Sequence, residues 1–125
     1  MADLKYVYTS GKLELEAHSA EELQHLISKV VAATKKRSVS VIVPTYNEEG
    51  NISRLVDAVS STMEKSGHSD FEIVVVDDNS KDSTPSIMNQ HAKGGKVAAV
   101  HRYGIRGIFS AVIDGVRAAR SDVVF

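Results

Sequence analysis

The feature that most constrains the fold is an alternation of short apolar runs with amphipathic segments, which begins near Ser38. Four runs are strand-length and rich in valine: residues 39–43, 71–76, 96–100 and 122–125. Apolar residues at helical spacing fill the three intervals between them. Strands that alternate with helices are joined by right-handed crossovers and therefore lie parallel. The sequence predicts an α/β fold with a doubly wound, mostly parallel sheet and helices on both faces.

Residues 1–37 follow a different pattern. Leu4, Tyr6 and Tyr8 alternate with polar or smaller residues, and a second alternation runs through residues 13–17 after a turn expected at residues 9–11. These features predict a β-hairpin. Apolar residues then recur at helical spacing over residues 20–34, behind a capping box formed by Ser19 and Glu22. We therefore divide the chain into a hairpin-and-helix extension, 1–37, and a second part, 38–125.

A basic cluster, Lys35-Lys36-Arg37, ends the predicted helix. Positive side chains near a helix C-terminus complement the helix dipole, and we interpret the cluster in that way. A phosphate or lipid site is the alternative.

Composition excludes several classes of function. The 125 residues fit one domain, and 15 basic against 16 acidic residues give a net charge of -1, which does not favour nucleic acid or anionic membrane as a partner. The chain has no cysteine, and its five histidines are scattered without metal-ligand spacing, so we interpret them as surface or helix-end residues. No signal peptide or membrane span is visible, and we expect a soluble cytoplasmic protein.

In a doubly wound sheet, ligands bind beyond the carboxyl ends of the strands, and three loops begin there: residues 44–50, 77–84 and 101–107. The first carries Pro44, which we expect to end its strand, and Tyr46, an aromatic face for stacking. Asn47 and Glu48 either bind polar ligand groups or cap and complement the next helix. The sequence of this loop is compatible with both interpretations, ligand binding and helix capping.

The second loop opens with Asp77 and Asp78 after a run of valines. Two adjacent carboxylates at a buried strand end repel each other unless amides, a cation or a ligand relieves them. Thr84 followed by Pro85 accounts for the start of the next helix, so the two acids are not needed there. We expect Asp77 to hold the turn and Asp78 to face a ligand.

The third loop, residues 102–107, combines two arginines with two glycines ahead of a helix. Arginines donate to phosphate, and a helix N-terminus favours anions, so Arg102, Arg106 and Gly107 are candidate phosphate contacts. A solvated loop is the alternative. The glycines fit neither the dinucleotide-binding fingerprint nor the P-loop pattern.

Three motifs together resemble the inverting glycosyltransferase family 2, which has the GT-A fold. They are Ser40-Val-Ile-Val-Pro-Thr-Tyr-Asn-Glu-Glu49, Phe71-Glu-Ile-Val-Val-Val-Asp-Asp-Asn-Ser-Lys-Asp-Ser-Thr84 and Gly107-Ile-Phe-Ser-Ala-Val-Ile-Asp-Gly115. The third points to the dolichyl-phosphate (polyprenyl-phosphate) mannosyltransferases within the family. The resemblance covers residues 38–125, the Rossmann-like nucleotide-binding half of such a domain.

The resemblance implies that the sugar of a nucleotide donor, GDP-mannose or another nucleotide sugar, is transferred to a lipid phosphate with inversion. It places Pro44, Tyr46 and Glu48 against the nucleoside, and Val76 and Asp78 against base and ribose. A carboxylate such as Asp78 can accept two N–H bonds from a guanine edge.

In the family, the strand that starts at Asp122 continues into an Asp-x-Asp motif that holds Mg²⁺ or Mn²⁺, and an acceptor-binding half follows. The sequence stops before both, so we assign no catalytic residue and no metal ligand, and we expect the chain alone not to transfer sugar. The alternative is a non-enzymatic chimeric or designed structural domain, in which residues 1–37 cover apolar surface. Exposed strand edges also favour a homodimer.

Overall fold

A computed structural model describes residues 5–34, 39–104 and 107–125 as six strands and four helices. The strands form one sheet in the order β2-β1-β5-β4-β3-β6. In chain order the elements are β1 Lys5–Ser10, β2 Leu13–Ala17, α1 Ala20–Thr34, β3 Val39–Thr45, α2 Ile52–Lys65, β4 Phe71–Asp77, α3 Thr84–Ala92, β5 Val97–Tyr103, α4 Ile108–Ala118 and β6 Val123–Val124.

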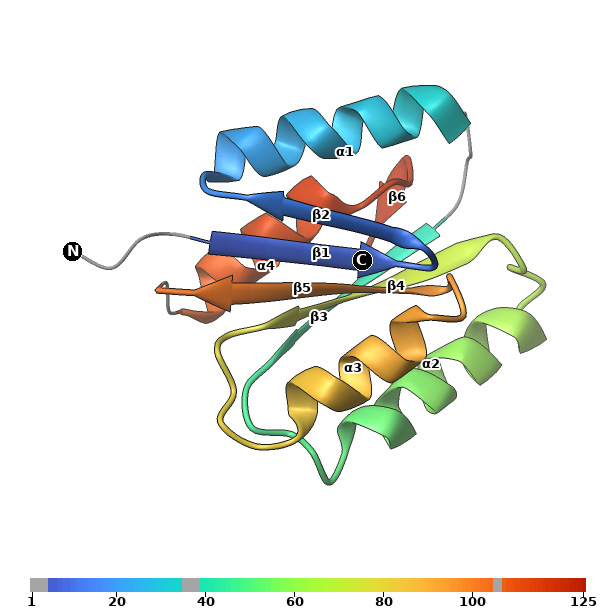
Figure 1. Ribbon diagram of the computed structural model, residues 1–125. Helices are drawn as coiled ribbons and strands as arrows, with labels where there is room; N and C mark the ends of the chain where they lie inside the picture. Colours follow the sequence, from blue (N-terminus) through green and yellow to red (C-terminus); the bar gives the residue numbers. More distant parts are fainter. Residues whose placement is uncertain (1–4, 35–38, 105–106) are drawn as a thin grey trace.

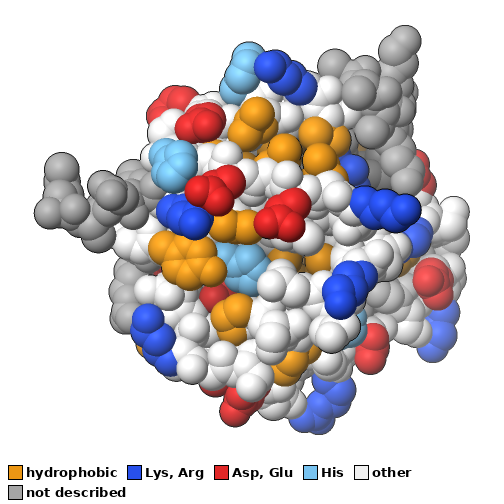
Figure 2. All heavy atoms as spheres, viewed as in Figure 1, with side chains coloured by type: hydrophobic (Ala, Val, Ile, Leu, Met, Phe, Trp, Pro, Cys, Tyr) orange, Lys and Arg blue, Asp and Glu red, His pale blue; other side chains and the backbone are white. Residues whose placement is uncertain are grey.

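Helices cover both faces of this sheet, with α1 and α4 on one side and α2 and α3 on the other (Figure 1). Strands β5, β4, β3 and β6 run parallel, while β1 is antiparallel to both β2 and β5. The predicted α/β, doubly wound, mostly parallel fold is confirmed. On the face of the molecule seen in Figure 2, charges of both signs are interspersed, as the net charge of -1 leads one to expect.

The N-terminal hairpin extends the parallel sheet along the free edge of β5. Its turn lies at Gly11 and Lys12, because Ser10 pairs with Leu13, so the turn expected at residues 9–11 is misplaced. Gly11 has a φ of 60°, a conformation that tight hairpin turns require and that glycine adopts without strain. The alternation of Tyr6 and Tyr8 therefore continues to Ser10, which is also buried.

Helix α1 spans the predicted residues, and Ser19 caps it as expected, whereas Glu22 binds the amide of His18 and not that of Ser19. The Glu22 amide donates to Ser19 Oγ at 3.0 Å, while the Glu22 carboxylate accepts from the His18 amide at 3.1 Å. Leu23 and Ile27 are buried in the core on the α1 side of the sheet. The basic cluster 35–37 lies outside the described residues.

Strands β3, β4 and β5 end later than predicted, β4 by a single residue, at Asp77. Strand β3 continues through Pro44, which pairs with Val76, so the prediction that this proline ends the strand is wrong. β6 pairs only with Val39 and Ser40, so Pro44 lies where that side of β3 has no strand neighbour among the described residues, and a missing N–H is tolerated there. β5 continues to Tyr103 because β1 pairs with its last residues.

Helix α4 presents the opposite face from the one predicted. The helical spacing in the third interval between the predicted strands comes from Ile108, Val112, Ile113 and Val116, which predicts that they face the sheet, but all four are exposed. The buried positions are Ala111, Asp114, Gly115 and Ala118. A Cβ added at Gly115 would lie 2.4 Å from Ile42 Cγ2, so α4 approaches the sheet too closely for large side chains.

Candidate functional site

The loops after β3 and β4 are joined to each other by five hydrogen bonds between side chains and backbone amides. We call residues 46–50 and 78–84 the paired loops. The bonds are Asn47 N to Ser80 Oγ (2.8 Å), Lys81 N to Asn47 Oδ1 (2.9 Å), Glu48 N to Thr84 Oγ1 (2.8 Å), Ser83 N to Glu49 Oε2 (2.8 Å) and Glu49 N to Asp82 Oδ2 (3.2 Å). The paired loops form one wall at the carboxyl ends of the strands.

This arrangement corrects the capping role considered for Asn47. Asn47 adopts a left-handed φ of 49° and bonds across to the second loop, whereas α2 begins only at Ile52, after Asn51. Asparagine tolerates the left-handed conformation better than most residues. Leu55 is one of the apolar residues whose helical spacing predicts the buried face of α2, but it is exposed.

Asp77 holds its turn as predicted. It is buried, and its Oδ2 accepts from the Ser80 amide at 2.9 Å while Oδ1 accepts from the Ser80 hydroxyl. The start of α3 differs slightly from the prediction that Thr84 caps it. Ser83 is the residue before the helix, and the Thr84 hydroxyl accepts from the Glu48 amide in the first loop. The Thr84 amide is bound by Asp82 Oδ1 at 2.9 Å instead.

Asp78 lies between β4 and the segment before α4. Its Oδ1 accepts from Arg102 Nε at 3.0 Å and forms an ion pair with Arg102 Nη2 at 2.9 Å, and its Oδ2 accepts from the Gly107 amide at 2.9 Å. The side chain is 15% exposed. Two of the predicted site residues, Asp78 and Gly107, are therefore in direct contact.

Arg102 is a structural cation rather than a free phosphate donor. Its side chain is 0% exposed and binds Asp114 Oδ2 through Nη1 at 3.1 Å and Ser110 Oγ through Nη2 at 3.0 Å, besides Asp78. A buried guanidinium needs such partners, since an unpaired charge in the interior is costly. The interpretation of Arg102 as a phosphate contact is thus corrected, and Arg106 lies outside the described residues.

Four of the five residues predicted to contact a nucleotide line one pocket. It measures about 250 Å³, and its wall consists of Pro44, Thr45, Tyr46, Glu48, Asp78, Ile108 and Ala111. Val76, the fifth, is fully buried in the core one residue inside β4 and does not line the pocket. Sequence reasoning missed three lining residues: Thr45 at the end of β3, and Ile108 and Ala111, which only the crossover of α4 brings there.

The pocket can hold a flat, polar ligand. Tyr46 is 43% exposed and offers an aromatic face, while Glu48 and Asp78 are acceptors for N–H or O–H groups. A second hollow of about 280 Å³ lies at the amino ends of the strands, beside Glu72, Lys96 and Arg120. The Glu72 carboxylate already accepts hydrogen bonds from the Ser40 hydroxyl and from Arg120, so groups of the protein itself compensate its charge.

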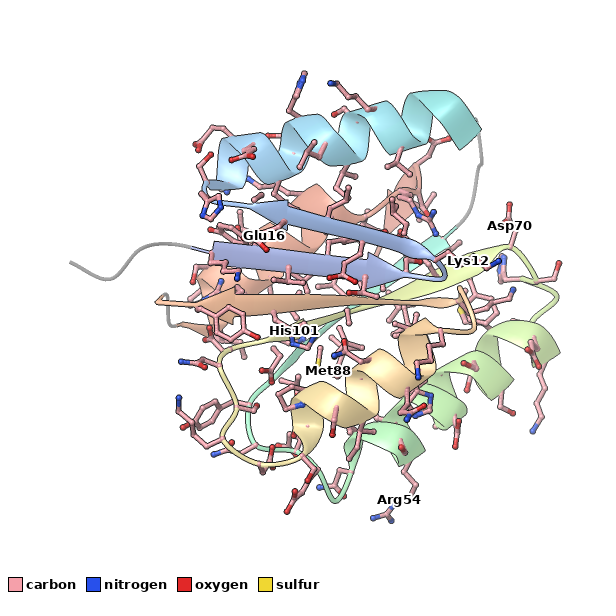
Figure 3. All side chains as sticks on the ribbon, viewed as in Figure 1. Lys12, Glu16, Arg54, Asp70, Met88 and His101 are labelled. Carbon is pink, nitrogen blue, oxygen red and sulfur yellow. The ribbon has the colours of Figure 1, made fainter. Side chains whose placement is uncertain are left out.

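His101 is buried, which corrects its interpretation as a surface residue. It lies on the α3 side of β5, near Met88, and its Nε2 is 2.8 Å from Asn89 Oδ1 (Figure 3). Burial lowers the pKa of His101, and the charge of Asp77 opposes that change. The neutral form is therefore favoured near pH 7.

Two kinds of feature are absent from the described ranges 5–34, 39–104 and 107–125. No group of three or more His, Cys, Asp or Glu residues there could hold a metal ion. None of the helices there is both long enough and apolar enough to cross a membrane.

The molecule is a doubly wound α/β domain with a pocket beyond the carboxyl ends of β3 and β4, where ligands of such sheets bind. Comparison with known proteins gives the family: the sequence model of "Glycosyl transferase family 2" matches residues 40–125. The chain belongs to glycosyl transferase family 2, and the resemblance inferred from its motifs is confirmed.

Two similar proteins are dolichol-phosphate mannosyltransferases. The one from Pyrococcus furiosus is 38% identical over 85 residues, which cover 68% of this chain and 23% of the relative. The one from Mycosarcoma maydis is 39% identical over 87 residues, or 66% of this chain and 30% of the relative. The undecaprenyl-phosphate 4-deoxy-4-formamido-L-arabinose transferase of Edwardsiella ictaluri is 34% identical over 88 residues, which cover 69% of this chain and 27% of the relative. The chain thus matches less than a third of the length of these relatives.

Proposed function

We propose that the pocket binds the nucleotide of a sugar donor, and that this donor is GDP-mannose. The observation that carries the proposal is the convergence of Pro44, Tyr46, Glu48 and Asp78 from two strands onto one pocket. The resemblance to the family implies that all four are nucleotide contacts. Their convergence at the carboxyl ends of parallel strands supports a shared ligand.

The proposed roles follow from side-chain chemistry. Tyr46 stacks on the base, and Pro44 and Glu48 contact the nucleoside. Asp78 accepts N–H groups of the guanine edge. Its Oδ1 accepts one hydrogen bond from Arg102 and is ion-paired with it, whereas its Oδ2 accepts only the Gly107 amide, so Oδ2 retains acceptor capacity. We assign Val76 an indirect role, because its buried side chain anchors the end of β4, from which Asp78 follows.

The diphosphate is proposed to lie toward Arg106 and Gly107, before the N-terminus of α4. The Gly107 amide already donates to Asp78, so Gly107 supports the pocket wall while the charge of Arg106 suits a phosphate.

The names of the relatives contain a dolichol or undecaprenyl phosphate. We therefore propose a lipid phosphate as acceptor in a complete enzyme. An acceptor phosphate oxygen would attack the anomeric carbon, and the nucleoside diphosphate would leave with inversion. A bound Mg²⁺ or Mn²⁺ would neutralise that leaving group. The residues described here offer no ligand set for it, so no step is assigned to a metal, and we propose that this chain binds donor without transferring sugar.

Calorimetric titration with GDP and UDP tests the donor assignment. We expect GDP to bind more tightly, and Tyr46→Ala to weaken binding about tenfold because stacking on an aromatic side chain contributes about 1 to 3 kcal/mol per base. Tyr103→Ala is the matched control, since Tyr103 is similarly exposed but does not line the pocket. Absence of binding to either nucleotide, or equal affinity of wild type and Tyr46→Ala, would contradict the proposal.

A second candidate function is a structural domain without enzymatic activity. It is favoured by the way the hairpin pairs with β5 while α1 packs beside α4. If residues 1–37 complete the fold, their deletion will unfold residues 38–125, as followed by circular dichroism. A deletion variant that keeps its fold and its GDP affinity would instead show that the segment is dispensable.

A further inference from the structure

The Ser80 hydroxyl lies at the junction of the paired loops and has two hydrogen-bond partners there. It donates to the buried carboxylate of Asp77 and accepts from the Asn47 amide, which is 2.8 Å away. The Ser80 amide also donates to Asp77, at 2.9 Å. Ser80 thus joins the end of β4 to the loop that follows β3 (Figure 1).

The chemistry of these groups leaves the Ser80 hydroxyl one arrangement. A carboxylate only accepts hydrogen bonds and a backbone amide only donates them, whereas a hydroxyl has one proton and two lone pairs. The Ser80 proton is therefore directed at Asp77, and a lone pair is left for the Asn47 amide. Since Asp77 is 1% exposed at the end of β4, the hydroxyl is held from the buried part of the sheet.

Asn47 needs support because its backbone conformation is unfavourable. Its φ of 49° is left-handed, which asparagine tolerates better than most residues but which still stores strain. Its side chain is bound as well, since Oδ1 accepts from the Lys81 amide at 2.9 Å. The bonds to Ser80 and Lys81 therefore hold the turn that directly follows Tyr46, a residue that lines the pocket.

We propose that Ser80 is a positioning residue for the nucleotide pocket, acting on Tyr46 through the turn at Asn47. This inference rests on the proposed function, because Tyr46 is taken there to stack on the base. It goes further, since Ser80 does not line the pocket. Recognition by the first loop is thereby made to depend on a hydroxyl of the second loop that does not touch the ligand.

Nuclear magnetic resonance of the ¹⁵N-labelled full chain tests the junction without any ligand. The readout is the hydrogen-exchange rate of the Asn47 amide, which donates to Ser80 Oγ. Ser80→Ala removes only the hydroxyl, and we expect it to raise that rate about fivefold, the effect of losing one neutral hydrogen bond. Ser80→Thr keeps a hydroxyl, and we expect it to leave the rate close to that of the wild type.

Ser86→Ala is the matched control for the exchange measurement. The Ser86 hydroxyl also bonds to a loop residue, the Ser83 carbonyl at 3.0 Å, but Ser86 lies in α3, outside the paired loops. This variant should leave the Asn47 exchange rate within about twofold of the wild type. Equal Asn47 exchange rates in Ser80→Ala and Ser86→Ala would overturn the inference, whatever GDP does.

A double-mutant cycle with Tyr46 separates positioning from a general structural role. The readout is the dissociation constant for GDP. We expect Ser80→Ala to raise it about fivefold in the presence of Tyr46, but less than about twofold in the Tyr46→Ala background. Equal rises in both backgrounds would overturn the inference, because Ser80 would then act independently of Tyr46. If wild type binds no GDP, the proposed function fails, and the exchange rates still decide whether Ser80 holds the turn at Asn47.

Ser80→Cys serves if Ser80→Ala does not fold. A thiol has about the size of the hydroxyl but donates and accepts only weakly. We expect faster exchange of the Asn47 amide and weaker GDP binding, each by about threefold. An unchanged Asn47 exchange rate in Ser80→Cys would also overturn the inference.

Discussion

Helices α1 and α4 pack against each other on one face of the sheet, yet they bury opposite kinds of side chain. Helix α1 turns Leu23 and Ile27 inward. Helix α4 turns Ala111, Gly115 and Ala118 inward, with Asp114 among them, and leaves Phe109 84% exposed. Only α1 follows the usual rule that the apolar stripe of a helix faces the core.

The difference has a physical cause in the site. Small residues let α4 lie close against β3 and β4, so that Asp114 reaches Arg102 and Ala111 reaches the pocket. Large residues in those positions would hold the helix away from the sheet. Among residues 20–30 of α1, whose side chains the structure describes, none lines the pocket, and Leu23 and Ile27 hold the helix by apolar burial. The position of α4 is therefore set by its close contacts beside the pocket, whereas the position of α1 is set by burial of its apolar side chains in the core.

The largest expected effect is on the side of α4. Arg102→Ala should lower the free energy of unfolding by about 4 kcal/mol, because it leaves the carboxylates of Asp78 and Asp114 buried without their cation. Urea denaturation measures the change. Arg117→Ala, which removes a half-exposed partner of Asp114, should cost less than about 1 kcal/mol. Similar losses of unfolding free energy in the two variants would contradict the claim that the buried Arg102 is the more important partner of the carboxylates.

Leu23→Ala should come next and tests the placement of α1. Leu23 is fully buried, so the substitution removes apolar contacts and leaves a cavity, at a cost of about 3 kcal/mol. The same urea experiment applies. A loss below about 1 kcal/mol would mean that α1 is not held by its core contacts.

Gly115→Ala tests how closely α4 approaches the sheet. The new Cβ would meet Ile42 Cγ2 at 2.4 Å and Val76 Cγ2 at 3.0 Å, and we expect a loss of about 2 kcal/mol from overpacking. Gly50→Ala is the control, because no atom lies within 4 Å of its added Cβ. Stabilisation by Gly115→Ala, as helix propensity alone predicts, would contradict the close packing.

The smallest effect is expected on the outer face of α4. Ile113→Asn changes a side chain that is 51% exposed, and the free energy of unfolding should fall by less than about 0.5 kcal/mol. A loss approaching that of Leu23→Ala would remove the contrast between the two helices. Size-exclusion chromatography of the same variant also shows whether this face joins two copies, since a dimer held there would dissociate.

The sequence predicts much of this structure, because strand and helix periodicity are local properties. The alternation of apolar runs was sufficient for the fold class, and the pattern from Ser19 to Thr34 was sufficient for α1 and its cap. Pro44, Tyr46, Glu48 and Asp78 were selected from loops whose position follows from the fold class, and the structure brings them to one pocket. Their role as nucleotide contacts stays a prediction.

What the sequence could not supply depends on partners distant along the chain. The burial of Arg102 follows from the β1–β5 pairing, which places a strand from the first residues of the chain against it. Asn47 could be a cap or a bridge between loops, and only the position of Ser80 decides. The prediction for the buried face of α4 was wrong because it followed the large apolar residues. This helix packs on the sheet through alanine and glycine, which a search for large apolar side chains at helical spacing does not pick out.

The paired loops have a thermodynamic consequence for whatever enters the pocket. Their amides and side chains satisfy one another before any ligand arrives, through the five bonds between residues 47–49 and 80–84. Ordering a loop on binding opposes association with an entropic cost, and this wall is already ordered. The pocket is thus preorganised on its β3–β4 side, and a ligand that fits Tyr46 and Asp78 meets them at positions fixed by folding.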